Sequence, residues 1–271
     1  GYTWGVAATL SNLGVLAVSA GDWPKARSYF EQSLALRQEL GDVEGVVIMH
    51  NNIGSLLRDQ GDLDRAEFHF RESLAVAIPL KMAYHIANSS LGLAQVHLAQ
   101  GRLADAQEAV DTSRSHAETI GAQELLAETY RIQAEIHLAH ARWEEALRAA
   151  RESATLAAET GARSLEAAAW RVASESELQQ GDLDAARQSL LKARRVLLSV
   201  TDELEAARVA AQAGRLYLRI GDSSEAGKHL RRARETFTRL GAKPDLQRVN
   251  KALNGCSVPT TRVQPHVSLW S

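Results

Sequence analysis

The sequence predicts an all-α fold: an α-solenoid in which six antiparallel helical hairpins wind as a right-handed superhelix and end on a short C-terminal capping helix. Two observations predict it. The 271 residues are 45% hydrophobic but only 5% aromatic, and they lack the β-branched and aromatic runs that form strands. The same turn and helix also return every forty residues, as in GDWPKARSYF from residue 21 and GDLDRAEFHF from residue 61. A fixed period of this length indicates stacked supersecondary units.

Two columns of small residues, read at the period of forty, define each hairpin. The first column is Ala in every copy: Ala26, Ala66, Ala106, Ala146, Ala186 and Ala226. The second column lies twelve residues earlier and holds Gly14, Gly54, Ala94, Ala134, Ser174 and Gly214. Because small side chains allow two helix axes to approach closely, these columns predict two packed helices in each repeat.

Glycine and aspartate mark the turn inside most hairpins, as in Gly61-Asp62. Glycine after a helix favours the left-handed conformation that ends it, and Asp before the next helix can accept hydrogen bonds from its first free N–H groups. Ala141 and, in the turns between hairpins, Lys81 stand where glycine is the rule. Pro24 falls in a first helical turn, where its missing N–H is harmless. Twelve helices of about 17 residues are expected, each roughly 25 Å long.

Larger apolar columns are expected to fill the interior. On the first helices the column is Leu16, Leu56, Val96, Ile136 and Leu216, with Ser176 out of pattern. On the second helices it is Phe30, Phe70, Val110, Ala150, Leu190 and Leu230. Trp23 and Trp143 share a column with leucines, which favours core positions over ligand platforms.

The chain is expected to divide into six repeats over residues 1–243, a capping helix over 244–255 and an irregular tail or linker over 256–271. A cap is expected because the terminal repeats of a solenoid must shield the last exposed core face. The tail has two prolines and no helical period. It ends in apolar side chains that could dock on a neighbouring copy: Val267, Leu269 and Trp270.

Small, apolar and turn residues follow the same order in the first two repeats. The first repeat has Leu13-Gly14, Gly21-Asp22-Trp23, Ala26 and Phe30. The second has Ile53-Gly54, Gly61-Asp62-Leu63, Ala66 and Phe70. This order resembles the tetratricopeptide repeat. The resemblance covers about residues 3 to 253, and its specificity comes from six copies in register.

A period of forty residues is longer than the usual period of about 34 in that family. It makes the chain similar to the long repeats of kinesin light chains, of Pins-type scaffolds and of the sensor arms of MalT-like bacterial regulators and related signalling ATPases. In the last group, repeats C-terminal to a nucleotide-binding module receive a ligand or a protein partner. The present chain contains no G-x-x-x-x-G-K-[ST] loop, so such a module would lie outside these residues.

The resemblance implies a concave surface lined by the first helix of each repeat. We expect a polar stripe there, at positions 8, 11, 12 and 15 of each forty, which faces neither the hairpin partner nor the next repeat. The candidate partner-binding residues are Asn12, Asn51, Asn52, Ser55, Asn88, Gln95, Glu128, Arg131, Glu135, Arg171, Glu175, Arg208, Gln212 and Arg215. Amides offer donors and acceptors to a peptide backbone, and Arg offers forks to carboxylates. The family resemblance assigns peptide-holding amides to Asn12 and Asn52. Exposure to water is the alternative explanation of the same polarity.

No pattern indicates catalysis, a cofactor or a metal. The sequence has no nucleophile elbow, no His-Glu-x-x-His and no Gly-rich phosphate loop. His97 and His137 share a column and His140 follows, but no Cys, Asp or Glu completes a ligand set on the same turn, so packing explains them better. We therefore expect no enzymatic activity, no cofactor and no metal.

Charge and hydropathy narrow the partners further. No apolar run approaches the roughly 20 residues that a membrane span needs, and a single cysteine, Cys256, fits a reducing, cytoplasmic location. Residues 1–135 hold 10 basic and 17 acidic residues, whereas residues 136–271 hold 21 and 16. Stacking aromatics do not accompany the basic cluster of the second helices, which argues against nucleic acid as a partner. That cluster is Arg194, Arg195, Arg231, Arg232 and Arg234.

The favoured interpretation is a protein-interaction module that binds a peptide or a partner's helix, as the sensor or scaffold arm of a larger bacterial-type regulator. One alternative is a self-assembling solenoid whose copies stack end to end or through the tail, so a homo-oligomer stays open. Another is a fragment of a signalling ATPase or transcriptional regulator whose activity belongs to absent domains.

Overall fold

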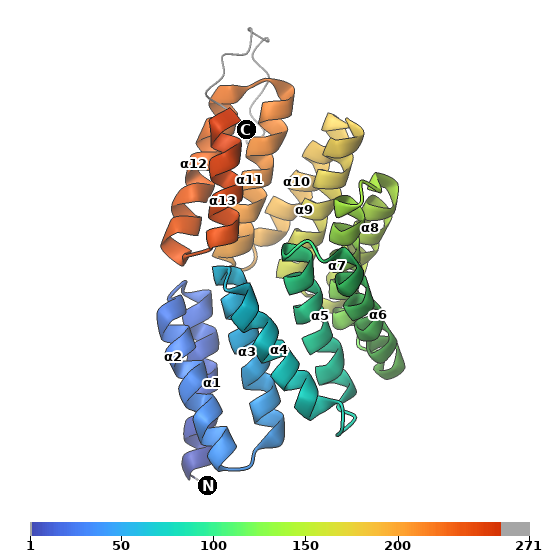
Figure 1. Ribbon diagram of the computed structural model, residues 1–271. Helices are drawn as coiled ribbons and strands as arrows, with labels where there is room; N and C mark the ends of the chain where they lie inside the picture. Colours follow the sequence, from blue (N-terminus) through green and yellow to red (C-terminus); the bar gives the residue numbers. More distant parts are fainter. Residues whose placement is uncertain (1, 256–271) are drawn as a thin grey trace. The chain divides into compact units, whose positions relative to one another are not determined.

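The computed structural model describes residues 2–255 and is helical throughout that range, without a strand (Figure 1). Thirteen helices follow one another along these residues. They are α1 Tyr2–Ser19, α2 Trp23–Glu39, α3 Val43–Gln60, α4 Leu63–Ala77, α5 Ala83–Ala99, α6 Leu103–Ile120, α7 Gln123–Ala139, α8 Trp143–Thr160, α9 Arg163–Gln180, α10 Leu183–Leu197, α11 Glu203–Ile220, α12 Ser223–Leu240 and α13 Lys243–Gly255. The predicted all-α solenoid of stacked helix pairs is confirmed.

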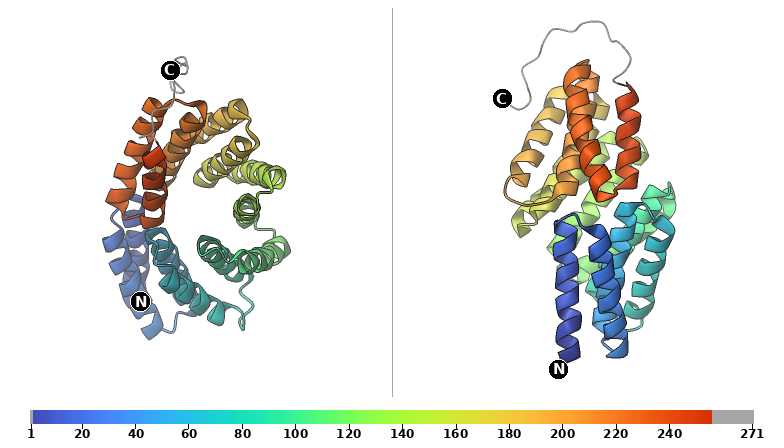
Figure 2. Two further views of the ribbon diagram at one scale, coloured as in Figure 1. Left: turned by 45° about the horizontal axis from the view of Figure 1, so that its top comes forward. Right: turned by 90° about the vertical axis from the view of Figure 1, so that its left-hand side faces the viewer.

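The helices form two compact units, residues 1–136 (unit 1) and 137–271 (unit 2), and the division falls in the last turn of α7. In unit 1 the pairs α1/α2, α3/α4 and α5/α6 are antiparallel hairpins, and α2 packs on α3 as α4 packs on α5 (Figure 2). In unit 2 the pairs α9/α10 and α11/α12 do the same, and α13 packs on both α11 and α12. Along residues 2–255, no helix combines the length and apolar character that crossing a bilayer would need.

The turns show the predicted chemistry, including its exceptions. Nine turn glycines in the described residues have a positive φ, from 66° to 93°. Lys81 and Ala141, which replace glycine, adopt the same conformation at 53° and 56°. Asp182 and Asp222 each cap the next helix by accepting from the backbone N–H three residues on, at 3.0 Å. Asp62 precedes α4 without a side-chain capping bond.

The small-residue columns work as predicted, with one refinement. All six alanines of the column from Ala26 to Ala226 have 0% exposure. The small column that begins at Gly14 leaves space for the large side chains of the second helices. A Cβ built on Gly54, for example, would lie only 3.0 Å from Phe70 Cζ. Gly14 faces Phe30 in the same way. Close helix packing therefore depends on a small residue opposite a large one.

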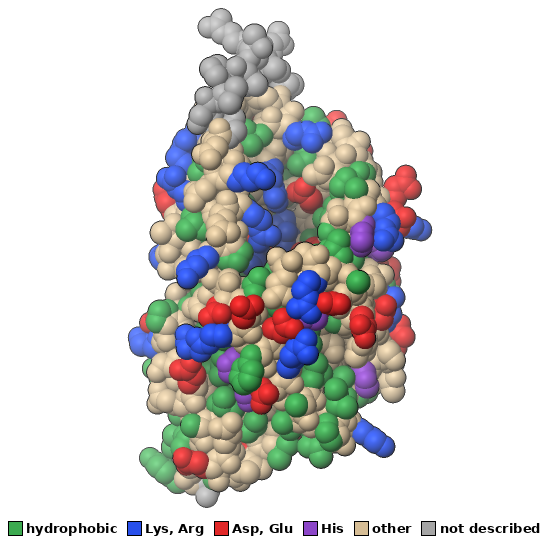
Figure 3. Space-filling view, viewed as in Figure 1, with side chains coloured by type: hydrophobic (Ala, Val, Ile, Leu, Met, Phe, Trp, Pro, Cys, Tyr) green, Lys and Arg blue, Asp and Glu red, His purple; other side chains and the backbone are tan. Residues whose placement is uncertain are grey.

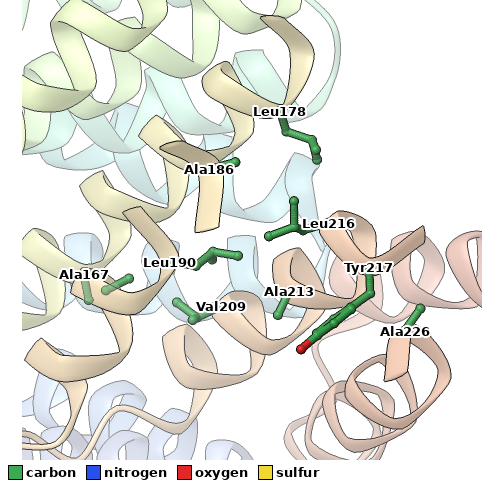
Figure 4. Packing of buried hydrophobic residues seen from close by; sticks show 10 residues of the cluster. Ala167, Leu178, Ala186, Leu190, Val209, Ala213, Leu216, Tyr217 and Ala226 are labelled. Carbon is green, nitrogen blue, oxygen red and sulfur yellow. The ribbon is translucent and has the colours of Figure 1, made fainter. Parts of the chain in front are cut away.

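Unit 2 shows how much of this core is alanine. Its buried cluster contains five alanines beside Leu178, Leu190, Val209, Leu216 and Tyr217 (Figure 4). Small side chains bring the helices close enough for the few large ones to interdigitate. The whole large-residue column of the second helices, from Phe30 to Leu230, is at most 2% exposed.

The large column of the first helices is buried with one exception. Leu56, Val96 and Leu216 are at most 4% exposed, as predicted, but Leu16 is 64% exposed. The prediction for Leu16 was wrong. Helix α2 of the preceding hairpin packs on α3, but within the described residues no preceding hairpin packs on α1. α1 also contains no charged residue, so its bare face is apolar.

Near the end of the described residues, α13 covers the last hairpin. It begins one residue before the predicted capping helix, and its Val249 is 2% exposed. The division into six repeats, cap and tail stays a prediction. The expected tail, with Val267, Leu269 and Trp270, lies outside the described residues.

Candidate functional site

The predicted stripe on the first helices is narrower than expected. At its eighth and fifteenth positions most side chains are half-buried, among them the polar Asn88 and Gln95. Asn51, at position 11, is 4% exposed instead: its Nδ2 donates to Val47 O at 3.3 Å and to Ser73 Oγ on α4 at 3.0 Å. The structure thus corrects the expected exposure of Asn51, which faces its hairpin partner.

In later repeats, the residue at position 12 points into the interior, where a neighbouring helix limits the space for its side chain. At this position on α5, Gly92 lies against the ring of Phe70 from the preceding helix, so that a Cβ there would overlap the ring. Ile132 and Gln212 at the same position have 0% exposure. A first helix contacts both its hairpin partner and the preceding hairpin, which leaves only a narrow face for solvent.

In unit 1, polar side chains link three successive first helices. Arg58 of α3 donates to Gln95 Oε1 of α5, and Gln95 Nε2 donates to Glu128 Oε1 of α7 at 2.8 Å. On α7, Arg131 then donates to Glu128 and to Glu135, each at 3.0 Å. Sequence reasoning missed Arg58, although it lies three residues after Ser55 and therefore on the same helix face.

Next to this ladder of hydrogen bonds between α3, α5 and α7, two asparagine amides have no hydrogen-bond partner in the described residues. Asn52 on α3 and Asn88 on α5 are half-buried, and their side-chain amides make no hydrogen bond with the part of the chain that the structure describes. Ser55 is also half-buried, and Asn12 on α1 is exposed. Because α3 contacts α5 directly, Asn52 and Asn88 lie on neighbouring helices.

In unit 2, the arginines of the stripe pair with buried carboxylates. Arg171 Nε on α9 donates to Glu205 Oε1 on α11 at 2.6 Å, and Arg208 Nη2 donates to Asp245 Oδ2 on α13 at 3.0 Å. Glu205 is 5% and Asp245 is 6% exposed. Burial raises the pKa of Glu205 against the attraction of Arg171 and Arg208. Burial acts the same way on Asp245, but the attraction of Arg208 keeps the pKa of that carboxyl below its usual value.

The remaining stripe residues of unit 2 differ in exposure: the side chain of Arg215 is 40% exposed, and Gln212 is buried. Arg215 Nη2 on α11 lies 3.4 Å from Glu175 Oε2 on α9. Gln212 has 0% exposure, and neither atom of its amide has a hydrogen-bond partner within residues 2–255. A buried amide in this state costs about 1–3 kcal/mol. On this unit, the predicted surface residues join helices to one another.

The histidines are dispersed among packed helices. His97 is 6% exposed and its Nε2 lies 3.5 Å from Glu67 Oε1, which is an ion-pair arrangement when the ring is protonated. His137 is half-buried, and burial lowers its pKa. Across residues 2–255, no three His, Cys, Asp or Glu side chains come together as a metal site would require.

Two family models that describe the tetratricopeptide repeat match the chain, over residues 5–78 and residues 51–117. The match agrees with the stacked hairpins of the fold. The chain carries tetratricopeptide repeats. None of the curated proteins matches its sequence.

Solved structures resemble this tetratricopeptide repeat protein at low sequence identity. A Rap protein complexed with competence and sporulation factor has a TM-score of 0.69 at 10% identity, over 91% of this chain and 73% of that one. NprR in complex with its cognate peptide NprX has a TM-score of 0.65 at 12% identity, over 83% and 66%. A signal transduction ATPase with a tetratricopeptide repeat sensor from Pyrococcus horikoshii has 0.62 at 13%, over 91% and 37%. At such identities the likeness concerns the fold.

The surface charge of the tetratricopeptide repeat protein differs along its length. Lys and Arg side chains gather over α11–α13 on the face drawn in Figure 3. On α13, Arg248 pairs with Asp245 at 2.9 Å, whereas Arg231, Arg232 and Arg234 are exposed on α12. Unit 2 therefore offers cationic side chains outside the stripe.

Proposed function

We propose that this protein is a non-catalytic protein-interaction module that binds an extended peptide segment of a partner along the stripe of unit 1. The observation that carries the proposal is the pair of half-buried amides, Asn52 and Asn88, which have no hydrogen-bond partner in the described residues. An Asn amide offers both a donor and an acceptor, which is what a peptide unit requires.

The surroundings of the two amides support this assignment. The ladder of Arg58, Gln95, Glu128 and Arg131 joins α3, α5 and α7, so the binding face is built on helices rather than on loops. Half-buried polar groups also form stronger hydrogen bonds than fully hydrated ones. Two similar folds, Rap and NprR, were solved with a factor and with a cognate peptide. A role as the sensor or scaffold arm of a larger cytoplasmic regulator belongs to the same proposal.

A selection experiment tests the proposal without a known partner. Random ten-residue peptides displayed on phage are selected on the wild-type protein, and the enriched peptides are synthesised and measured by fluorescence anisotropy. We expect Asn52→Ala/Asn88→Ala to weaken their binding by about tenfold or more, since loss of two hydrogen bonds removes about 1–3 kcal/mol. Far-UV circular dichroism should be unchanged.

The matched control is Gln38→Ala, which removes an exposed amide from α2 of the same unit. It should leave peptide binding as in the wild type. The proposal fails if no peptide is enriched, or if the enriched peptides bind the double variant as tightly as the wild type.

A further inference from the structure

A second surface lies on unit 2, between α10, α11 and α12. These helices enclose a groove of about 500 Å³. The residues that line it include Ala206 and Ala210 of α11, Arg194 of α10 and Arg232 of α12. At 100° per residue, Ala206 and Ala210 point away from the side of α11 that carries Arg208, so the groove is separate from the stripe.

Small side chains open this groove at positions where the other repeats carry larger ones. The column of Ala206 otherwise holds Val6, Val46, Ile86, Leu126 and Glu166. The column of Ala210 otherwise holds Leu10, His50, Ser90, Tyr130 and Trp170. Ala206 and Ala210 are the smallest members of their columns, and they occur together in the last repeat only.

The aromatic members of the second column show what fills this place elsewhere. The Tyr130 ring in unit 1 lies under Arg114, whose Cζ is 5.5 Å from the ring centroid. The Trp170 ring in unit 2 lies under Lys192, whose Nζ is 4.0 Å from the centroid. In two repeats, position 10 is therefore a ring in contact with a cation from a second helix.

Around Ala210, arginines occupy the positions that correspond to both of these cations, but Ala210 itself has no ring. Arg194 precedes Ala210 by the same sixteen residues that separate Arg114 from Tyr130. Arg232 follows Ala210 by the same twenty-two residues that separate Trp170 from Lys192. The groove thus has the place for a ring and the cations that would flank it, with the ring itself replaced by a methyl group.

We propose that this groove binds an aromatic side chain of an acidic partner segment. The ring fills the space above Ala206 and Ala210 and lies against the guanidinium of Arg232. Leu198, which is 80% exposed where α10 ends, adds apolar contact at the edge. The segment is a second contact of the partner, or of another protein, and does not depend on the stripe of unit 1.

The acidic character of the segment follows from the charges that line the groove. Three arginines, Arg194, Arg232 and Arg239, line it against one acidic residue, Glu203, and Arg239 pairs with Glu203 across the mouth. Carboxylates that flank the aromatic residue therefore meet an excess of positive charge. A nucleic acid would meet the same charge, but the aromatic residue that lines the groove, His229, is already stacked on Tyr217, with the ring centroids 5.4 Å apart.

A labelled nonapeptide with one Trp flanked by Glu residues tests the proposal by fluorescence anisotropy on the full chain. Two matched peptides replace the Trp by Ala or the Glu residues by Lys. We expect the wild type to bind the first peptide and to bind each matched peptide at least about tenfold more weakly, because each lacks one of the two contacts. Equal binding of the three peptides would overturn the proposal, as would no binding of any.

Variants of the groove provide the second readout. Ala210→Trp supplies the ring that Trp170 supplies one repeat earlier, so it should abolish binding of the Trp peptide while the protein stays helical. Arg232→Glu should also weaken binding by about tenfold or more. Arg231→Glu is the matched control, because Arg231 is an exposed neighbour on α12 that does not line the groove. It should bind the peptide as the wild type does.

Three further outcomes would overturn the proposal. One is equal loss of binding in Arg232→Glu and Arg231→Glu, which would indicate a diffuse charge effect. Another is tighter binding of a short single-stranded DNA than of the Trp peptide, which would indicate a phosphate-binding surface. The third is peptide binding that appears only after residues 256–271 are deleted, which would assign the groove to this chain's own terminal segment.

Discussion

In unit 1 the polar stripe leaves Asn52 and Asn88 without a hydrogen-bond partner in the described residues, whereas in unit 2 Arg171 and Arg208 each pair with a buried carboxylate. The stripe positions are the same in the two units, since both follow from the period of forty residues. Their side chains, however, serve different ends. Unit 1 joins its first helices through Gln95 but leaves two amides without a partner in the described residues, whereas unit 2 uses Arg171 and Arg208 between helices.

The difference shows that a repeat column fixes the place of a side chain but not its partner. Gln95 and Glu175 occupy the same position, yet Gln95 forms hydrogen bonds with both the preceding and the following first helix, and Glu175 forms an ion pair with an arginine of the following one. In unit 2 the acceptors of Arg171 and Arg208, Glu205 and Asp245, are at most 6% exposed, so these two ion pairs are screened little by water. We therefore expect the charged stripe residues of unit 2 to contribute mainly to stability. Three sets of substitutions test this contrast between the units.

The largest expected effect is on the buried pair of unit 2. Arg171→Met leaves Glu205 without its nearest cation in an environment where it is 5% exposed, and we expect a loss of about 3 kcal/mol in the free energy of unfolding. Arg131→Met is the matched change in unit 1. Its acceptors, Glu128 and Glu135, have side chains that are 36% and 23% exposed, so we expect a loss of about 1 kcal/mol or less.

Urea unfolding followed by circular dichroism measures both variants, and hydrogen exchange shows which helices open first. Because repeat arrays need not unfold in one step, the exchange of α9–α11 is the more direct readout for Arg171→Met. Equal losses in the two variants would contradict the contrast between the units.

Periodicity was enough to predict the framework, but it could not predict burial at every position. Ala26 and its five counterparts were predicted correctly, because a strict small-residue column has one physical meaning, which is close helix contact. Leu16 and Asn51 were not, since their exposure depends on which neighbouring helix packs against them, and spacing along one helix does not specify that. The groove at Ala210 escaped detection because an alanine in a helix carries no signal until its column is compared with its neighbours in space.

The next effect in size is the response of unit 1 to acid. His50 Nδ1 and His69 Nδ1 lie 3.0 Å apart, so one ring must donate and the other accept. Burial lowers the pKa of His50, and burial together with the His50 charge lowers the pKa of His69 to about 4. The unfolded chain then binds more protons than the folded one between about pH 6.5 and pH 4, so stability is lost as the pH falls through that window.

His69→Asn should reduce this loss by between about 1 and 2 kcal/mol, a value discounted because both rings are partly hydrated. Urea unfolding of the wild type and the variant at pH 7.5 and pH 5 measures it. Glu205 in unit 2 responds in the opposite direction: its raised pKa makes its contribution to stability fall as the pH rises above about 4.5. A pH dependence that His69→Asn leaves unchanged would remove the pair as its cause.

The smallest expected effect concerns the frame that both units share, and it should therefore be equal in the two. Lys81 in unit 1 and Ala141 in unit 2 hold φ at 53° and 56°, where a Cβ is strained and glycine is not. We expect Lys81→Gly and Ala141→Gly each to raise the free energy of unfolding by about 1 kcal/mol, slightly reduced by the greater freedom of glycine in the unfolded chain.

Gly101→Ala is the reverse change at a turn with φ of 75° and open space around the Cβ, so its cost of about 1 kcal/mol measures backbone strain alone. If Ala141→Gly destabilises the protein, contacts of the Ala141 methyl group stabilise the turn by more than its positive φ costs. The preference for glycine at this position would then not apply to that hairpin.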